Sequence, residues 1–318
     1  MNSKLAEKRI AVVGIGGVGG YLAGLLGRVC PHLTLGARGA RGELLRENGL
    51  VLHSDYKGEI AVRPERVVPV EQMEEQDYLF LCVKNYSLET VCRQLDRAVT
   101  EHTVVIPVMN GVDPGERLRS LLGRGTVVDS LIYIVAFANG DGSVTQQGKF
   151  ANLRVGVPHG DAEQQRKVRE VSDILTAADI DHKVAEDIEA EIWRKYMLNC
   201  AYNVTTACYN ATIGQIRRDP AKAREYETLV REAYQVARAK GVAVKPEHVE
   251  EILRRFYKEH AEDATSSLQR DIWSGRPSEL ETFCGYIVRE ADRLKVPAPV
   301  TGDMYRRLKA LEAQEGKA

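Results

Sequence analysis

The chain has few cysteines and no excess of either charge. Its 318 residues include six cysteines, with no C-x-x-C pair and no metal-like spacing to histidine. This pattern favours buried reduced thiols, a reducing cytoplasm and no metal site. Lys and Arg total 44 against 45 for Asp and Glu, so the composition lacks the basic footprint of a nucleic-acid-binding protein.

Long apolar segments are also missing. No run approaches the ~18–20 residues that a membrane span needs. The charged N-terminus leads directly into the first hydrophobic segment, which leaves no room for a secretory signal. We therefore expect a cytoplasmic protein without a membrane anchor, and its length favours two domains.

A glycine-rich turn follows the first hydrophobic segment. The apolar run at residues 10–13 indicates a strand buried on both faces, and an apolar helix is predicted from Tyr21. Between them, Gly14 permits a tight turn, Gly16 lets the backbone approach a pyrophosphate, and Gly19 lets the helix pack closely. The helix N-terminus offers free N–H groups to a phosphate. The pattern predicts a dinucleotide site; a glycine-rich turn without a cofactor is the alternative.

The end of the second predicted strand indicates which cofactor binds. Arg38 follows this strand, where an NAD site carries an acidic residue for the ribose 2′-hydroxyl. The chain has no acidic residue there before Glu43, and Arg41 lies close by. A guanidinium can pair bidentately with a 2′-phosphate, so we expect NADP(H) rather than NAD(H). The alternative is an ordinary surface charge at a strand end.

Two polar residues follow later predicted strands. Lys84 ends the apolar run at residues 78–83, and Asn110 ends the run at residues 104–108. Ligands of open α/β sheets bind just outside the carboxyl ends of the strands, so both residues are expected at the cofactor site. Loop polarity and an Asn-Gly turn are the alternative.

The pattern of the chain changes near residue 186. Short apolar strands and helices alternate before it, and long helical patterns dominate after it. We expect an α/β fold with a doubly wound Rossmann domain over residues 1–186. An all-α domain would follow over residues 187–318, with a cleft between the two.

A helix predicted over residues 191–208 carries polar side chains in an apolar setting. Lys195, Asn199 and Asn203 are four residues apart and share one helix face. The residues around them are mostly apolar, and buried amides and ammonium groups need partners. A substrate could supply these partners; the alternative is a helix with a single solvated face.

A second polar cluster lies further along the chain. Ser278 and Glu281 have the spacing of a capping box, which places Glu279 in the first turn of a helix. A favourable interaction with the helix dipole would explain Glu279 without a functional role. Helix-start hydroxyls would likewise explain Ser266 and Ser267. Spacing alone places none of these residues beside the polar face at residues 191–208.

These motifs resemble the ketopantoate reductase (2-dehydropantoate 2-reductase) family over nearly the whole chain. The matches in the first half are V-V-G-I-G-G-V-G, L-x-A-R ending at Arg38, C-V-K ending at Lys84, and N-G at Asn110. The more specific matches are W-x-K-x-x-x-N-x-x-x-N at residues 193–203 and S-S-x-x-x-D-I-x-x-G-R-x-x-E at residues 266–279.

The resemblance implies NADPH-dependent reduction of 2-dehydropantoate to pantoate, a step toward pantothenate and coenzyme A. It implies that Lys195 donates the proton and that Glu279 holds the substrate's hydroxyl near that lysine. Lys84 and Asn110 would lie where cofactor meets substrate. The residues matched to substrate binding are Asn199, Asn203 and Ser267.

Three positions depart from the family's pattern at its substrate contacts. Val204 stands where the family often has proline, and Ile213 stands where an asparagine is common, although Asn210 lies close by. Ala264 stands where some members have asparagine. A related NADPH-dependent reductase of another 2-keto acid, of a 3-hydroxy acid or of an imine therefore remains an alternative. A non-catalytic NADPH-sensing protein is a third possibility, although a sensor has no need of a proton donor. We expect a small-molecule 2-keto acid as the partner, and a monomer or a homodimer.

Overall fold

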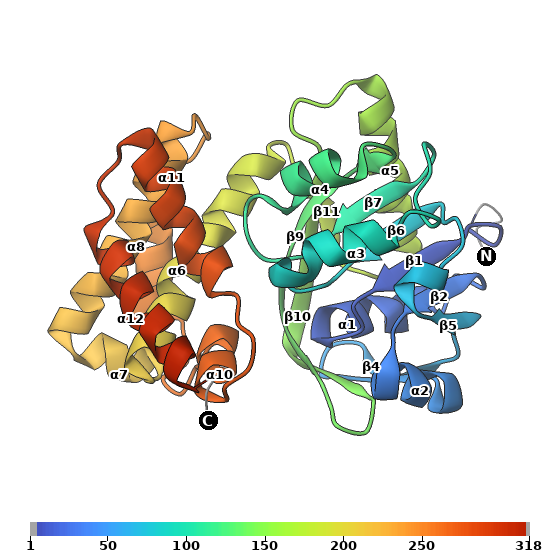
Figure 1. Ribbon diagram of the computed structural model, residues 1–318, viewed down its shortest axis with the longest axis horizontal. Coiled ribbons are helices and arrows are strands. Elements are labelled where there is room, and N and C mark those ends of the chain that lie inside the picture. The colour runs from blue at the N-terminus through green and yellow to red at the C-terminus, as the bar shows by residue number, and fades with distance from the viewer. Residues whose placement is uncertain (1–4, 316–318) are drawn as a thin grey trace. The chain divides into compact units, whose positions relative to one another are not determined.

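The computed structural model describes residues 5–315, which divide into two compact units. The N-terminal unit ends at Ile188 and the C-terminal unit begins at Glu189 (Figure 1). Among the described residues, no helix combines the length and the apolar character needed to cross a membrane.

A parallel sheet of six strands forms the first layer of the N-terminal unit. Its strand order is β5-β2-β1-β6-β7-β8, and all neighbouring strands pair in parallel. This order reverses direction between β1 and β6, as in a doubly wound Rossmann sheet, which confirms the predicted fold class. The strands are β1 (Ile10–Val13), β2 (Leu33–Gly36), β5 (Arg66–Val68), β6 (Tyr78–Leu81), β7 (Val104–Pro107) and β8 (Thr126–Val127).

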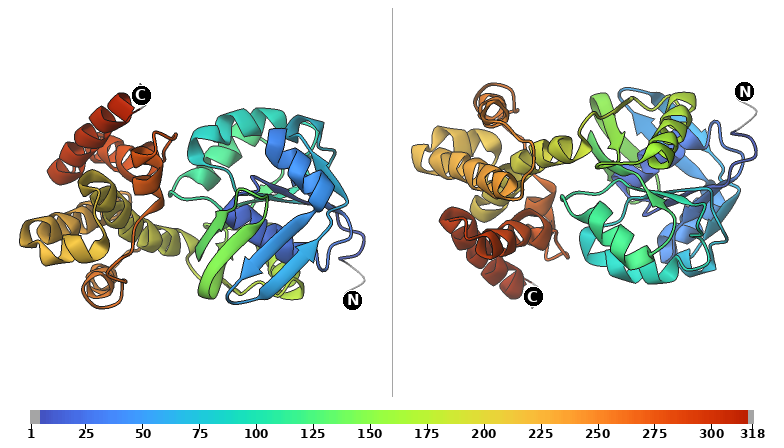
Figure 2. Two further views of the ribbon diagram at one scale, coloured as in Figure 1. Left: turned by 90° about the horizontal axis from the view of Figure 1, so that it is seen from below. Right: turned by 90° about the horizontal axis from the view of Figure 1, so that it is seen from above.

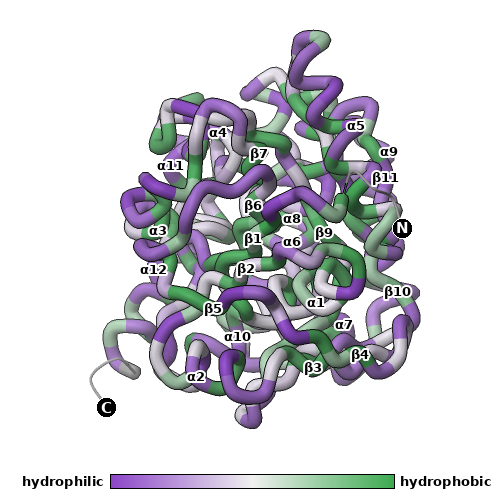
Figure 3. The backbone as a smooth tube through the Cα atoms, turned by 90° about the vertical axis from the view of Figure 1, so that its right-hand side faces the viewer, coloured by the Kyte–Doolittle hydropathy of each residue, from purple (hydrophilic) through white to green (hydrophobic). Residues whose placement is uncertain are grey.

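Both faces of this sheet are buried. Successive side chains of a strand point to opposite faces. Accordingly, Ile10 and Val12 of β1 join one apolar cluster, whereas Ala11 and Val13 join another. Figure 3 shows β1, β2 and β6 in the hydrophobic colour. The second cluster is covered by α3 (Leu88–Gln94) and α4 (Pro114–Leu122).

A second sheet, of five strands, was not anticipated from the sequence. Its order is β11-β10-β3-β4, and β9 pairs with β10. Helix α1 (Gly17–Leu26) contacts β1 and β2 of the first sheet and β3, β4, β9 and β10 of the second, so it lies between the two layers. The strands are β3 (Leu50–Ser54), β4 (Gly58–Val62), β9 (Asp129–Ala138), β10 (Val144–Gly156) and β11 (His182–Val184). The remaining helical segments of this unit are α2 (Gly39–Asn48), α5 (Ala162–Ala177), and the 3₁₀ turns η1 (Val70–Gln72) and η2 (Asn85–Ser87).

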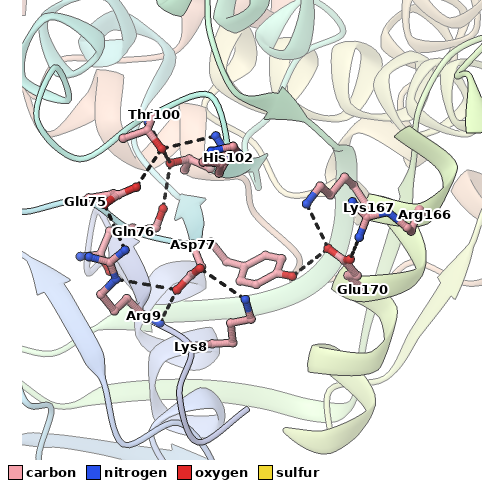
Figure 4. A network of polar contacts seen from close by, with 12 residues as sticks. Lys8, Arg9, Glu75, Gln76, Asp77, Thr100, His102, Arg166, Lys167 and Glu170 are labelled. Carbon is pink, nitrogen blue, oxygen red and sulfur yellow. Dashed lines mark hydrogen bonds and ion pairs between the residues drawn. The ribbon is translucent and has the colours of Figure 1, made fainter. Parts of the chain in front are cut away.

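A polar network closes the N-terminal ends of β1 and β6 (Figure 4). The Asp77 carboxylate accepts hydrogen bonds from the Arg9 backbone N–H at 2.9 Å and from Lys8 Nζ at 3.4 Å. The Tyr78 hydroxyl donates to Glu170 of α5 at 3.0 Å. These bonds tie together the edge of the sheet opposite the glycine turn.

The C-terminal unit is helical (Figures 1 and 2). Its long helix α8 has Pro220 as the first helical residue, and the Asp219 carboxylate accepts from the Ala221 N–H at 3.0 Å. The helices are α6 (Ile188–Tyr209), α7 (Ile213–Arg218), α8 (Pro220–Ala239), α9 (Pro246–Lys258), α10 (Ser267–Trp273), α11 (Tyr286–Leu294) and α12 (Pro299–Glu315).

The predicted capping box at residues 278–281 is wrong. The Ser278 hydroxyl accepts from the Leu280 N–H at 3.2 Å, but Glu281 does not complete the box. Its carboxylate instead binds the Tyr305 hydroxyl at 2.6 Å and Lys309 Nζ at 2.8 Å, both on α12. A π-helical turn, η3 (Glu281–Gly285), begins at this residue and leads into α11. The bonds to α12 therefore take the place of the local cap.

Candidate active site

The three glycines of the first turn differ in how closely other atoms surround them. Gly14 has φ of +88°, and a Cβ added to it would lie 2.7 Å from the Cys82 carbonyl oxygen. A Cβ on Gly19 would lie 2.1 Å from the Gly14 carbonyl oxygen, so this glycine permits the close packing of α1. Gly16 is exposed, and an added Cβ would meet no atom within 4 Å. The turn is thus tightly packed on the protein side and open at Gly16.

The N-terminus of α1 is available to an anion. Gly16 is its N-cap residue and provides no side chain to accept from the first N–H groups. Such groups, with the helix dipole, favour a phosphate. The open face of the turn and these donors therefore fit a dinucleotide pyrophosphate.

Arg38 lies beside this turn at the end of β2. Gly36 of β2 pairs with Val13 of β1, the residue before Gly14. Arg38 follows two residues later as the exposed N-cap residue of α2. Its position fits contact with a phosphate on the adenosine ribose.

Lys84 and Asn110 follow the next two strands of the same sheet. Because β6 lies beside β1 and β7 lies beside β6, both residues are at the carboxyl edge that carries Gly14. The Asn85 side chain donates to the Asn110 carbonyl oxygen at 2.6 Å and thereby joins the two segments. Asn85 is a buried residue whose structural role the sequence did not reveal. The N-terminal unit therefore brings its six predicted site residues to one edge.

Lys195 and Glu279 interact electrostatically within the C-terminal unit. Lys195 is partly buried on α6, and burial lowers its pKa to about 8 while the negative charge of Glu279 opposes this shift. Glu279 itself is only 4% exposed and immediately precedes the helical segment that contains η3. An amine and a carboxylate that are 84 positions apart in the sequence therefore act on each other.

Asn203 and Ser267 lie in contact. The Asn203 side-chain oxygen accepts from the Ser267 hydroxyl and from the Leu268 N–H, both at 3.5 Å. Its amide nitrogen donates to the Asn199 carbonyl oxygen at 3.0 Å. Asn203 is 6% exposed and connects α6 to the start of α10. A substrate that donates a hydrogen bond to the Asn203 side-chain oxygen would replace two long, weak hydrogen bonds.

Two further contacts hold these segments in place. The Thr206 hydroxyl donates to Ser266 Oγ at 2.7 Å, and Ser266 Oγ accepts from the Gln269 N–H at 3.1 Å. Ser266 is thus the N-cap residue of α10, as the structural alternative proposed. The Tyr196 hydroxyl donates to the Thr282 carbonyl oxygen in η3 at 2.5 Å. Sequence reasoning missed this contact, although a buried tyrosine hydroxyl signals a partner elsewhere.

Two cavities of the N-terminal unit lie away from the predicted site. One, of about 400 Å³, is lined in part by Leu5, Val29 and Pro31. The other, of about 320 Å³, is lined in part by Asp77 and Tyr78 of the polar network in Figure 4. Neither is lined by a predicted site residue, and no cluster of metal-ligating side chains occurs within residues 5–315.

Two family models match the chain. Ketopantoate reductase PanE/ApbA matches residues 10–159, and Ketopantoate reductase PanE/ApbA C terminal matches residues 187–312. The fold and the family matches together define an oxidoreductase of the Rossmann type that acts on CH–OH groups. More narrowly, the chain belongs to the ketopantoate reductase PanE/ApbA family, which confirms the resemblance of its motifs.

Three similar proteins match this chain over nearly their whole lengths. An uncharacterized oxidoreductase, YkpB, of Bacillus subtilis is 28% identical over 307 residues, covering 96% of this chain and 100% of the relative. A 2-dehydropantoate 2-reductase of Mesorhizobium japonicum is 28% identical over 333 residues, covering 97% and 99%. The crystal structure of a PanE/ApbA family ketopantoate reductase from Ralstonia eutropha superimposes with a TM-score of 0.87 at 25% identity, covering 97% and 99%.

Proposed function

We propose that this protein is an NADPH-dependent 2-dehydropantoate 2-reductase that supplies pantoate for pantothenate and coenzyme A synthesis in the cytoplasm. The observation that carries the proposal is the Lys195–Glu279 interaction, in which a partly buried ammonium has a lowered pKa. The proposal is also supported by the chain's membership of the family and by relatives named 2-dehydropantoate 2-reductase.

NADP(H) is the proposed cofactor. The open turn at Gly16 and the uncapped N-terminus of α1 fit the pyrophosphate. Arg38 would bind the 2′-phosphate, and no acidic side chain stands at the end of β2 to repel it. Lys84 and Asn110 would bind at the nicotinamide side. When bound, NADPH supplies the hydride that reduces the keto carbon.

Lys195 is the proposed proton donor. Its Nζ would hold a proton against the keto oxygen, stabilise the negative charge that develops there, and then transfer the proton. A pKa of about 8 keeps the amine largely protonated at neutral pH and makes proton transfer easier than from an ordinary lysine.

Glu279 and the amide face would orient the substrate. Glu279 would accept a hydrogen bond from the substrate's hydroxyl while its charge favours the protonated form of Lys195. The residues proposed to bind the remaining polar groups of the substrate are Asn199, Asn203 and Ser267.

A related reductase of another 2-keto acid is the second candidate, and the departures from the family pattern favour it. Ile213 and Ala264 are neighbours, because the Ile213 N–H donates to the Ala264 carbonyl oxygen at 3.0 Å. Ile213 is fully buried and Ala264 partly buried. Two positions at which family members carry asparagine are therefore adjacent and apolar here, so two amide side chains that a polar substrate could use would be missing.

Initial rates of NADPH oxidation with 2-dehydropantoate and a panel of other 2-keto acids test the proposal. We expect the largest kcat/KM with 2-dehydropantoate, and a loss of at least ~100-fold in Lys195→Ala. Lys240→Ala is the matched control, because Lys240 is a lysine of the same unit that pairs with Glu290 at 2.8 Å.

Three outcomes would contradict the proposal in different ways. A higher kcat/KM with another 2-keto acid would favour the second candidate. NADPH binding without turnover of any keto acid would favour a sensing protein. Near-normal turnover in Lys195→Ala would remove this residue from the role of proton donor. Size-exclusion chromatography with light scattering separates a monomer from a homodimer; a neighbour in fold, the Staphylococcus aureus ketopantoate reductase, is described as dimeric.

A further inference from the structure

Arg41 reaches the glycine turn from the first turn of α2. Its Nε donates to the Ile15 carbonyl oxygen at 3.1 Å, and Ile15 lies between Gly14 and Gly16. Its Nη1 donates to the carbonyl oxygen of Gly142, in the turn between β9 and β10. One guanidinium thus joins the nucleotide turn to a turn more than a hundred residues later.

The start of α1 packs so closely against β9 and β10 that Gly17 and Gly20 leave no room for a side chain. A Cβ on Gly17 would lie 2.2 Å from the Ala136 carbonyl oxygen of β9. A Cβ on Gly20 would lie 2.3 Å from a Val144 methyl group of β10. The β9–β10 hairpin therefore lies directly on the start of α1, and Arg41 fastens its turn to the carbonyl that precedes Gly16.

The charge of Arg41 is poorly compensated. Its hydrogen bonds from Nε and Nη1 go to neutral carbonyl oxygens, and its Nη2 is buried without a hydrogen-bond partner among residues 5–315. Burial lowers the pKa of Arg41, and the charge of Asp141 partly offsets this effect. An arginine remains charged under these conditions, so the turn carries a fixed positive charge.

We infer that Arg41 is a positioning residue for the shared part of the nicotinamide cofactor. It holds the Gly14–Gly16 turn in the conformation that receives the pyrophosphate and adds positive potential there. Because Nη2 is covered, Arg41 acts through the turn and not by contact with the 2′-phosphate. This inference rests on the proposed cofactor site and gives Arg41 a role different from that of Arg38.

The two arginines therefore predict different patterns of affinity. Arg38 would contact a phosphate that only NADPH carries, so its loss should weaken NADPH binding and leave NADH binding unchanged. Arg41 supports the pyrophosphate site, which NADPH and NADH share. Its loss should weaken the binding of both by a similar factor.

Fluorescence titration of the full chain with NADPH and with NADH, without keto acid, measures this difference. We expect Arg41→Ala to raise both dissociation constants about tenfold or more, as for the loss of hydrogen bonds from a charged group. Arg41→Lys keeps the charge without the paired geometry and should recover part of the affinity for both. Arg46→Ala is the matched control, because Arg46 lies on the same helix and donates to the Val67 carbonyl oxygen at 3.2 Å.

Thermal unfolding of each variant shows whether it is folded. If Arg41→Ala does not fold, the dissociation constants of Arg41→Lys test the inference instead. Dissociation constants within twofold of wild type in the folded Arg41 variants would overturn the inference. A loss confined to NADPH would overturn it too, because Arg41 would then contact the 2′-phosphate. Failure of the wild type to bind either nucleotide would instead refute the proposed function.

Discussion

The proposed role of Lys195 as proton donor predicts how the reaction rate depends on pH. Burial lowers the pKa of this lysine from 10.5 to about 8, against the opposing charge of Glu279. Proton donation requires the ammonium form, which predominates below this pKa and is lost as the pH rises through it. We expect kcat/KM for keto-acid reduction to fall about tenfold per pH unit above about pH 8. A lysine with the ordinary pKa of ~10.4 would keep its plateau about two units further.

Initial rates of NADPH oxidation across this range, with the cofactor saturating, locate the alkaline limb. The binding of NADPH is measured separately at each pH, so that a change in cofactor affinity is not mistaken for the ionisation of Lys195. A plateau that extends beyond about pH 9.5 would refute the reasoning, because the proton donor would then not be a desolvated lysine.

Glu279→Gln tests the electrostatic partner of this lysine. An opposite charge within ~4–6 Å typically shifts a pKa by about 1–3 units, or about 1.4–4 kcal/mol. Removal of the carboxylate should therefore move the alkaline limb at least about one unit to lower pH, beyond any loss of rate. Glu281→Gln makes the same charge change nearby, but its carboxylate binds Lys309 and Tyr305. A limb that moves equally in both variants, or in neither, would contradict the assignment.

Three further substitutions have distinct expected outcomes. Gly14→Ala places a Cβ 2.7 Å from the Cys82 carbonyl oxygen at a residue with positive φ. It should lower the free energy of unfolding by more than ~1 kcal/mol and weaken NADPH binding. Unchanged urea unfolding would contradict this expectation. Arg38→Ala should raise the dissociation constant for NADPH about tenfold while leaving NADH unaffected, as measured by titration. Tyr196→Phe removes the hydrogen bond to the Thr282 carbonyl and should cost about 1–2 kcal/mol in urea unfolding, whereas a neutral result would mean that water replaces the hydroxyl.

The features that were predicted correctly depend on short stretches of sequence. The fully apolar run of β1 and the glycines after it each determine their local conformation. Lys195, Asn199 and Asn203 share a face because helical spacing alone places them there. Such features can be predicted because the residues that determine them lie close together in the sequence.

The features that were missed depend on distant partners. Strand β3 pairs with β10, which places Leu52 beside Val144. Neither segment contains a local pattern that predicts this pairing. The predicted capping box does not form because Glu281 binds side chains of α12, about two dozen residues later in the sequence. Tyr196 and Thr282 are 86 residues apart, and Arg41 and Gly142 are 101 apart. Such contacts are selected by tertiary packing, which overrides local propensity.

The same lysine argues for catalysis over simple nucleotide sensing. Its pKa is about 8 in the folded chain and near 10.5 when unfolded, so the unfolded state binds the proton more tightly. Below pH 8 both states are protonated, and folding bears the net cost of desolvation less the attraction of Glu279, roughly 3 kcal/mol. This cost is relieved as the pH rises from about 8 to 10.5. A protein that only binds NADPH would gain stability by replacing Lys195 with an apolar residue. The proposed reductase would keep this lysine because the desolvation that destabilises the fold also lowers its pKa toward the pH at which its proton would be transferred.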